Sequence, residues 1–223
     1  MDYWAPKIAL MYRIVFFLSS SLLLLQCNSK QAKSELPYYN SPDFTPHFLT
    51  TSEAQKQITH TIASFSFTDQ DGKNITPKNI EGKIHVANFF FTACGSICPA
   101  IMKNLKETQS GFINDTNVVF LSYSVTPWRD SVAKLKQYAV NMALNTANWH
   151  LLTGNKAAIY TLARTSYFAE ENIGFSKDST QFLHTEHILL VDKQKRIRGI
   201  YNGTLQLETQ QLAKDIGTLK AEQ

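Results

Sequence analysis

The amino-acid sequence predicts an α/β domain in which a central mixed β-sheet is flanked by helices. Two continuous apolar runs of strand length, residues 84–91 and 118–125, are each followed by a segment with helical spacing. Towards the carboxyl end, two further strand-like runs flank a polar turn, and a helical pattern follows them. Strands that are buried on both faces need helices on both sides of the sheet, so these observations favour a layered α/β fold.

The composition suits one domain and excludes several classes of protein. The chain has 223 residues, 43% of them hydrophobic and 12% aromatic, which is enough for one full core. The formal net charge is only +4 and the basic residues are scattered, so we expect no nucleic-acid partner. Three cysteines form at most one intramolecular bridge, which excludes a disulfide-stapled scaffold.

Residues 1–26 predict a signal peptide or a membrane anchor. Residues 14–26 form an uncharged run of thirteen residues after Arg13, shorter than the roughly 20 that a membrane span needs. Cys27 follows directly, where a bacterial lipoprotein is cleaved and lipidated, although Gln26 stands where a small residue is usual. We therefore expect a lipoprotein of the cell envelope, lipidated at Cys27, with its domain facing the periplasm. An uncleaved N-terminal anchor is the alternative.

Residues 27–58 predict a polar tether between the membrane and the domain. This segment is rich in Ser, Asn, Gln and Lys and contains three prolines. The globular domain is expected over residues 59–223.

The domain is expected to begin with a hairpin and a buried strand. Residues 65–68 alternate between apolar and polar side chains, and residues 69–73 contain the Asp-Gly pair of a tight turn. The run at 84–91 then predicts a strand that is buried on both faces. After Cys98, Pro99 takes a first-turn position of a helix. The apolar residues of this helix are Ile101, Met102, Leu105 and Phe112.

The remaining pattern continues the alternation of strands and helices. The predicted elements are a strand at 118–125, a helix beginning near Val132, a strand at 149–152, a helix at 156–167, strands at 187–191 and 196–201, and a helix at 205–219. This order is typical of the thioredoxin-like fold, in which helices cover both faces of a mixed sheet.

Cys94 and Cys98 are the strongest chemical signal in the chain. They lie between the strand at 84–91 and a helix, so both sulfurs should lie at the edge of the sheet near a helix N-terminus. Exposed amides and the helix dipole favour thiolate over thiol there, which suits a nucleophile or a metal ligand. Two small apolar residues packed in a loop are the alternative without chemistry.

Two histidines near the strand at 187–191 are candidates for a third ligand. The entrance of this strand should face the cysteine loop, so His184 can approach both sulfurs, and His187 is its competitor. Two thiolates and one imidazole form a soft site that suits copper, as Cu(I) or Cu(II), better than zinc, because zinc needs a fourth protein ligand.

A dithiol–disulfide role without a metal is the main alternative. Thioredoxin-type reductases have two residues between their cysteines, whereas this chain has three, and residues 177–191 lack the proline that such enzymes carry before the following strand. A peroxiredoxin needs a threonine three positions before its reactive cysteine, where Phe91 and Gly95 stand.

Three motifs in the same order resemble the Sco/SenC family. They are Phe-Thr-Ala-Cys-Gly-Ser-Ile-Cys-Pro at residues 91–99, Ser-Val-Thr-Pro-Trp-Arg-Asp at residues 124–130, and His184 four residues before Ile188. The likeness covers about residues 37–215. It implies a thioredoxin-like fold and a copper protein that assembles cytochrome c oxidase.

The resemblance also implies roles for particular residues. Cys94 and Cys98 would be the redox-active pair and two copper ligands, and His184 would be the third ligand. The protein would be a metallochaperone that delivers copper to the CuA site on subunit II of cytochrome c oxidase, or reduces the cysteines of that site. Gly95 and Thr126 depart from the family pattern, which has proline and aspartate there. A thiol-disulfide oxidoreductase and a redox or copper sensor are the alternatives.

Overall fold

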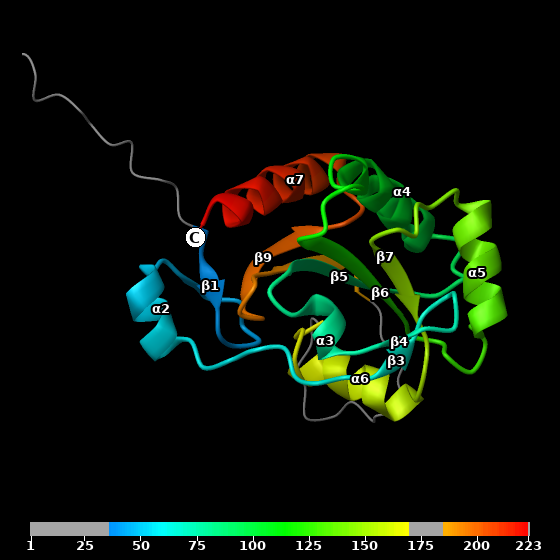
Figure 1. The fold of residues 1–223 in the computed structure, drawn as a ribbon, viewed down its shortest axis with the longest axis horizontal. Helices are drawn as coiled ribbons and strands as arrows, with labels where there is room; N and C mark the ends of the chain where they lie inside the picture. Colours follow the sequence, from blue (N-terminus) through cyan, green and yellow to red (C-terminus); the bar gives the residue numbers. More distant parts are fainter. Residues whose placement is uncertain (1–35, 170–184, 223) are drawn as a thin grey trace, which may run out of the picture. The chain divides into compact units, whose positions relative to one another are not determined.

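A seven-stranded mixed sheet forms the centre of the protein. Its strand order is β2-β1-β9-β8-β5-β6-β7, which begins with the short strands β2 (Pro46–His47) and β1 (Tyr38–Tyr39). The computed structural model describes residues 36–169 and 185–222 (Figure 1). Strands β5 (Ile84–Phe90), β6 (Val118–Ser124) and β7 (Trp149–Leu152) are parallel neighbours. Strand β8 (His187–Val191) pairs antiparallel with both β5 and β9 (Ile197–Asn202). The predicted mixed sheet is therefore confirmed.

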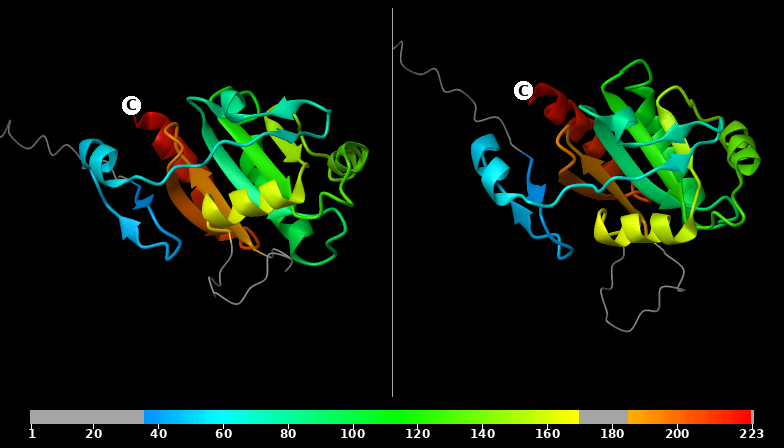
Figure 2. Two further views of the ribbon diagram at one scale, coloured as in Figure 1. Left: turned by 90° about the horizontal axis from the view of Figure 1, so that it is seen from below. Right: turned by 60° about the horizontal axis from the view of Figure 1, so that its bottom comes forward.

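Helices cover both faces of this sheet (Figures 1 and 2). Helices α4 (Ile97–Ser110), α5 (Val132–Asn141) and α7 (Gln206–Ala221) contribute to one apolar cluster, and we call this side the α4 face. Helices α6 (Lys156–Thr165) and α3 (Pro77–Ile80) contribute to the other, on the α6 face. In β5, β6 and β8, alternate residues belong to the two clusters, as the period of a strand requires. In β8, Ile188 and Leu190 lie on the α4 face, and Leu189 and Val191 lie on the α6 face.

The continuous apolar runs form the two most buried strands. All seven residues of β5 and all seven of β6 are buried, as expected for strands between two helical layers. The predicted hairpin is also present, because β3 (Phe67–Thr68) pairs with β4 (Asn74–Ile75). Gly72 in its turn has a φ of 77°, a backbone conformation that glycine adopts without strain.

Residues 38–58 belong to the folded domain, although the sequence predicted a tether as far as residue 58. Strand β1 (Tyr38–Tyr39) pairs with β9 and with β2 (Pro46–His47), and α2 (Thr51–Gln57) follows. Tyr38 is buried: it packs with Ala54 and Ile58, and the guanidinium groups of Arg196 and Arg198 lie 4.8 and 3.9 Å from its ring centroid. The two arginines are distant in sequence, so the local polar composition of the segment was misleading.

The N-terminal predictions, the signal or anchor at 1–26 and lipidation of Cys27, lie outside the described residues. Within residues 36–169 and 185–222, no helix has both the length and the apolar character needed to cross a membrane.

His85 is a buried titratable group in the middle of the sheet. It lies in β5, is fully buried, and its Nε2 is 3.1 Å from the hydroxyl oxygen of Tyr167. Burial, with a smaller contribution from the positive charge of Lys195, lowers the pKa of His85 to about 3. An unfolded chain protonates this residue near pH 6.5, so between these two values the unfolded state binds more protons.

The stability of the protein is therefore expected to fall as the pH decreases from 6.5 towards 3. A His85→Gln variant should lose this component, because glutamine stays neutral in both states. Between pH 6.5 and 4.5, the free energy of unfolding of the parent protein should fall by about 2–3 kcal/mol more than that of the variant. Urea unfolding at several pH values measures this difference. Equal pH dependence of the two proteins would contradict the assignment.

Candidate metal centre

The two cysteines lie at the junction of β5 and α4, where the sequence predicted them. Cys94 is a partly exposed residue of the connecting loop, and its backbone N–H donates to the carbonyl oxygen of Phe91 at 3.2 Å. Cys98 lies in the first turn of α4 and is only 4% exposed. Both are free thiols.

The sulfur of Cys94 accepts a hydrogen bond at the start of α4. The backbone N–H of Cys98 donates to it with a nitrogen–sulfur distance of 3.4 Å. Ser96 occupies the N-cap position of α4, but its side chain accepts no hydrogen bond from the backbone of the first turn. The sulfur of Cys94 takes this role and accepts from one of the backbone N–H groups that have no partner within the helix. The helix start thereby holds Cys94 next to Cys98.

The two thiols differ in acidity because their surroundings differ. Burial raises the pKa of Cys94, but hydrogen bonds from the thiol of Cys98 and from the backbone N–H groups of Cys98, Ser96 and Ile97 outweigh it, so that this pKa lies below its usual value. For Cys98, burial is the largest cause, and the neighbouring Cys94 adds to it, which raises the pKa to about 12. Cys94 is therefore the group that more readily forms a thiolate.

We expect iodoacetamide to modify Cys94 at least about tenfold faster than Cys98 in the reduced protein, because thiolates are the reacting species and Cys98 is shielded. Short exposures followed by fragmentation mass spectrometry of the peptide that contains both cysteines measure the two rates. Equal rates, or faster modification of Cys98, would contradict the described difference between the thiols.

A cavity of about 320 Å³ lies beside both sulfurs. The cysteine loop and the end of β5 form most of its wall, and Val125 and Thr185 complete it. Val125 follows the last residue of β6, and Thr185 precedes β8. The ends of three strands therefore meet at the cysteine loop. The cavity between them has room for an ion or for a side chain of a partner.

The structure distinguishes the two candidate histidines only in part. His184 lies outside the described residues, although the next residue, Thr185, lines the cavity beside the sulfurs. His187 starts β8 on the α6 face, where its ring contacts Phe44 edge-to-face at 5.9 Å between centroids. Cys98 packs on the α4 face. The sheet thus separates His187 from the cysteine pair.

Other described histidines have contacts elsewhere. The ring of His60 forms a hydrogen bond with the carbonyl oxygen of Ser166 and stacks on Phe168. His85 forms a hydrogen bond with the hydroxyl of Tyr167, and His150 forms one with the carboxylate of Asp69. In the described part of the chain, no group of three His, Cys, Asp or Glu side chains is placed to hold a metal ion.

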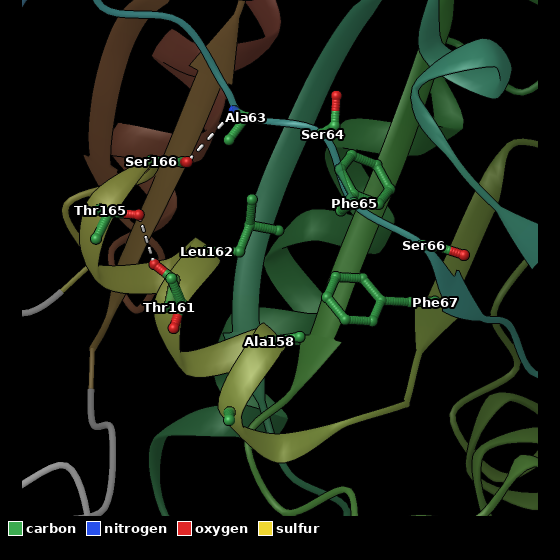
Figure 3. A pocket seen from close by; sticks show the side chains of 11 residues that line it. Ala63, Ser64, Phe65, Ser66, Phe67, Ala158, Thr161, Leu162, Thr165 and Ser166 are labelled. Atoms are coloured by element: carbon green, nitrogen blue, oxygen red, sulfur yellow. Dashed lines mark hydrogen bonds between the residues drawn. The ribbon is translucent and has the colours of Figure 1, made fainter.

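A larger cavity, of about 680 Å³, lies between residues 63–67 and α6 (Figure 3). The described side chains that line it belong to Ala, Ser, Thr, Phe and Leu, without a cysteine, a histidine or a charged group. Ser166 accepts a hydrogen bond from the backbone N–H of Ala63, and the hydroxyl of Thr165 donates to the carbonyl oxygen of Thr161. Of these two cavities, the one beside the cysteines is the one lined by side chains that can bind a soft metal ion.

Asp130, for which the sequence predicted no role, lies close to the cysteine loop in the structure. Its carboxylate accepts hydrogen bonds from Thr92, the second residue after β5. An aspartate after Pro-Trp-Arg is typical of an ordinary turn. Its position in the Ser-Val-Thr-Pro-Trp-Arg-Asp motif was the one sequence feature that indicated a further role.

The comparison with family models finds one match over most of the chain. The SCO1/SenC model matches residues 53–221. A relative, the SCO1 protein homolog of Bacillus subtilis (strain 168), is 30% identical over 148 residues, which cover 66% of this chain and 76% of the relative.

Solved structures of Sco proteins have a similar fold. BsSco, described as having a disulfide switch and as a member of the Sco family of cytochrome c oxidase assembly proteins, has a TM-score of 0.62 at 27% identity, over 74% of this chain and 95% of its own. A SCO1/SenC family lipoprotein from Bacillus anthracis str. Ames has a TM-score of 0.63 at 27% identity, over 73% and 96%. ScoI from Bradyrhizobium japonicum, solved with copper bound, shares the fold with a TM-score of 0.57 at 24% identity, over 71% and 99%.

The matched residues 53–221 amount to 169 of the 223 residues and include both cysteines and the five longer strands of the sheet. The predicted thioredoxin-like fold is confirmed, and the chain belongs to the SCO1/SenC family.

Proposed function

We propose that the protein binds one copper ion through Cys94, Cys98 and His184 and acts in the assembly of cytochrome c oxidase. The observation that carries this proposal is the cavity that both thiols share with Thr185, the residue next to His184. Family membership, the copper bound to ScoI and the description of BsSco as a member of a family of oxidase assembly proteins support it.

The side chains fit copper chemically. Thiolate and imidazole are preferred ligands of copper, and Cu(I) accepts three of them without a fourth. Cys94 offers a sulfur whose pKa is lowered by hydrogen bonds, while Cys98 gives up its proton when it becomes a ligand. Phenylalanines at the end of β5 form an apolar wall beside the sulfurs, which limits the access of water on that side.

The finer proposal is that copper passes to the CuA site on subunit II of the oxidase. Cys94 is partly exposed at the rim of the cavity, so a thiolate of the partner can reach copper and replace the ligands of this protein one at a time. The test mixes the copper-loaded full chain with the reduced, copper-free subunit II domain. With two copper-loaded chains for each subunit II domain, copper should leave the full chain, and the CuA absorption spectrum should appear once an added one-electron oxidant such as ferricyanide converts the two transferred Cu(I) ions to the mixed-valence state. A Cys98→Ser variant should fail to produce it.

A thiol-disulfide oxidoreductase is the second candidate, supported by the two adjacent free thiols of unlike pKa and by the disulfide switch described for BsSco. In this reaction the dithiol gives two electrons and two protons to a disulfide of the target, and a Cys94–Cys98 disulfide forms. If the metal-free protein reduced the oxidised CuA cysteines quickly while the loaded protein transferred no copper, this candidate would replace the first.

Membrane attachment is a separate proposal. The apolar run before Cys27 supports a lipoprotein signal, and the Bacillus anthracis relative is described as a lipoprotein. The domain would then lie in the periplasm, close to a membrane-embedded oxidase. Mass spectrometry of the mature protein should find residues 1–26 removed and a lipid on Cys27. A mature chain that retains residues 14–26 would contradict lipidation.

A further inference from the structure

Asp130 is a buried carboxylate at the base of the cysteine loop. It is 1% exposed, and its two oxygens accept four hydrogen bonds. Thr92 donates twice, from its backbone N–H at 3.2 Å and from its hydroxyl at 2.6 Å. The hydroxyls of Ser124 and Thr126 donate at 2.6 and 2.9 Å. So many donors offset the cost of removing the carboxylate from water.

These hydrogen bonds join two segments of the chain that meet at the cavity. Thr92 lies two residues before Cys94, where the chain leaves the sheet. Ser124 ends β6, and Thr126 follows Val125, which lines the cysteine cavity. Because Asp130 binds both the backbone and the hydroxyl of Thr92, it fixes the direction in which the loop departs from β5 as well as its position.

We propose that Asp130 is a positioning residue for the cysteine pair. By holding Thr92 against the end of β6, it keeps the sulfur of Cys94 within reach of Cys98, although Asp130 itself is not a ligand. Two thiols that are held together have a high effective concentration, which favours both a disulfide and a shared ion. The consequence for copper rests on the proposed function, whereas the effect on the thiols stands without it.

The test measures the dithiol–disulfide equilibrium of the full, copper-free chain in glutathione buffers. The two thiols give two electrons and two protons to oxidised glutathione, which becomes two molecules of reduced glutathione, and the Cys94–Cys98 disulfide forms. An Asp130→Ala variant should shift this equilibrium towards the dithiol by at least about tenfold, which corresponds to a potential about 30 mV less negative.

A conservative replacement and a matched control separate positioning from general stability. The dithiol–disulfide equilibrium constant of Asp130→Asn should stay within about threefold of the parent value. The amide oxygen of the asparagine still accepts from the backbone N–H of Thr92, and its NH₂ group can donate to the hydroxyl oxygen of Thr92. Asp69 is also 1% exposed and holds a turn, accepting from the backbone N–H groups of Asp71 and Lys73. Asp69→Ala should lower the melting temperature and leave the equilibrium unchanged.

If Asp130→Ala does not fold, Thr92→Val decides the question. It removes only the hydroxyl donor of a partly exposed residue and should shift the equilibrium in the same direction, while Thr92→Ser should not. An unchanged equilibrium in a folded Asp130→Ala, or in Thr92→Val, would overturn the proposal. A parent chain that bound no copper would refute the proposed function instead, since these measurements contain no metal.

Discussion

Replacing both Cys94 and Cys98 with serine is expected to abolish copper binding, and each single replacement should weaken it by at least about a hundredfold. Loss of an outer-shell partner alone typically costs 10–100-fold in metal affinity, and a serine hydroxyl cannot replace a thiolate ligand for Cu(I). Both sulfurs line one cavity, so each single variant leaves an incomplete site. Metal analysis and competition with a Cu(I) chelator on the full chain measure the loss.

Cys27 is the matched control for this prediction, because it is the third cysteine of the chain and is separated from the pair in sequence. Its replacement by serine should leave the copper stoichiometry at one. A site that kept copper in the Cys94→Ser, Cys98→Ser double variant, or lost it in Cys27→Ser, would show that the metal is bound elsewhere.

His184→Ala is expected to lower copper affinity by about a hundredfold, whereas His187→Ala should leave it close to that of the parent. His187 contacts Phe44 on the α6 face, and the sheet lies between it and the cysteines. The pair of variants changes the same residue type at two positions three residues apart. Equal losses, or a larger loss for His187→Ala, would reject the proposed ligand set.

The sequence predicted the central part of the fold because strong local patterns produce it. Strands β5 and β6 are continuous apolar runs, and α7 was predicted from a helical pattern, so the expected bounds of all three differ from the observed ones by at most two residues. Strand β1 was missed because it is only two residues long and because its partners, β9 and the side chains of Arg196 and Arg198, lie in another part of the chain. Local composition carries no sign of such a partner.

The candidate site was predicted in its outline and not in its fine structure. A pair of cysteines between a buried strand and a helix indicated the position of both sulfurs. Which face His187 occupies depends on where β8 begins, and one residue of register would have reversed the answer. The lowered pKa of Cys94 follows from neighbouring donors at the helix start, as its position in the sequence suggested. The raised pKa of Cys98 and the hydrogen bonds of Asp130 depend on tertiary burial and contacts, which no local pattern encodes.

X-ray absorption spectroscopy of the full chain loaded with one equivalent of Cu(I) tests the ligand set most directly. The spectrum should require two sulfur neighbours and one imidazole nitrogen, and the imidazole contribution should disappear in His184→Ala while persisting in His187→Ala. Copper surrounded by sulfur alone in the parent protein, or a spectrum that His184→Ala leaves unchanged, would contradict a centre built from Cys94, Cys98 and His184.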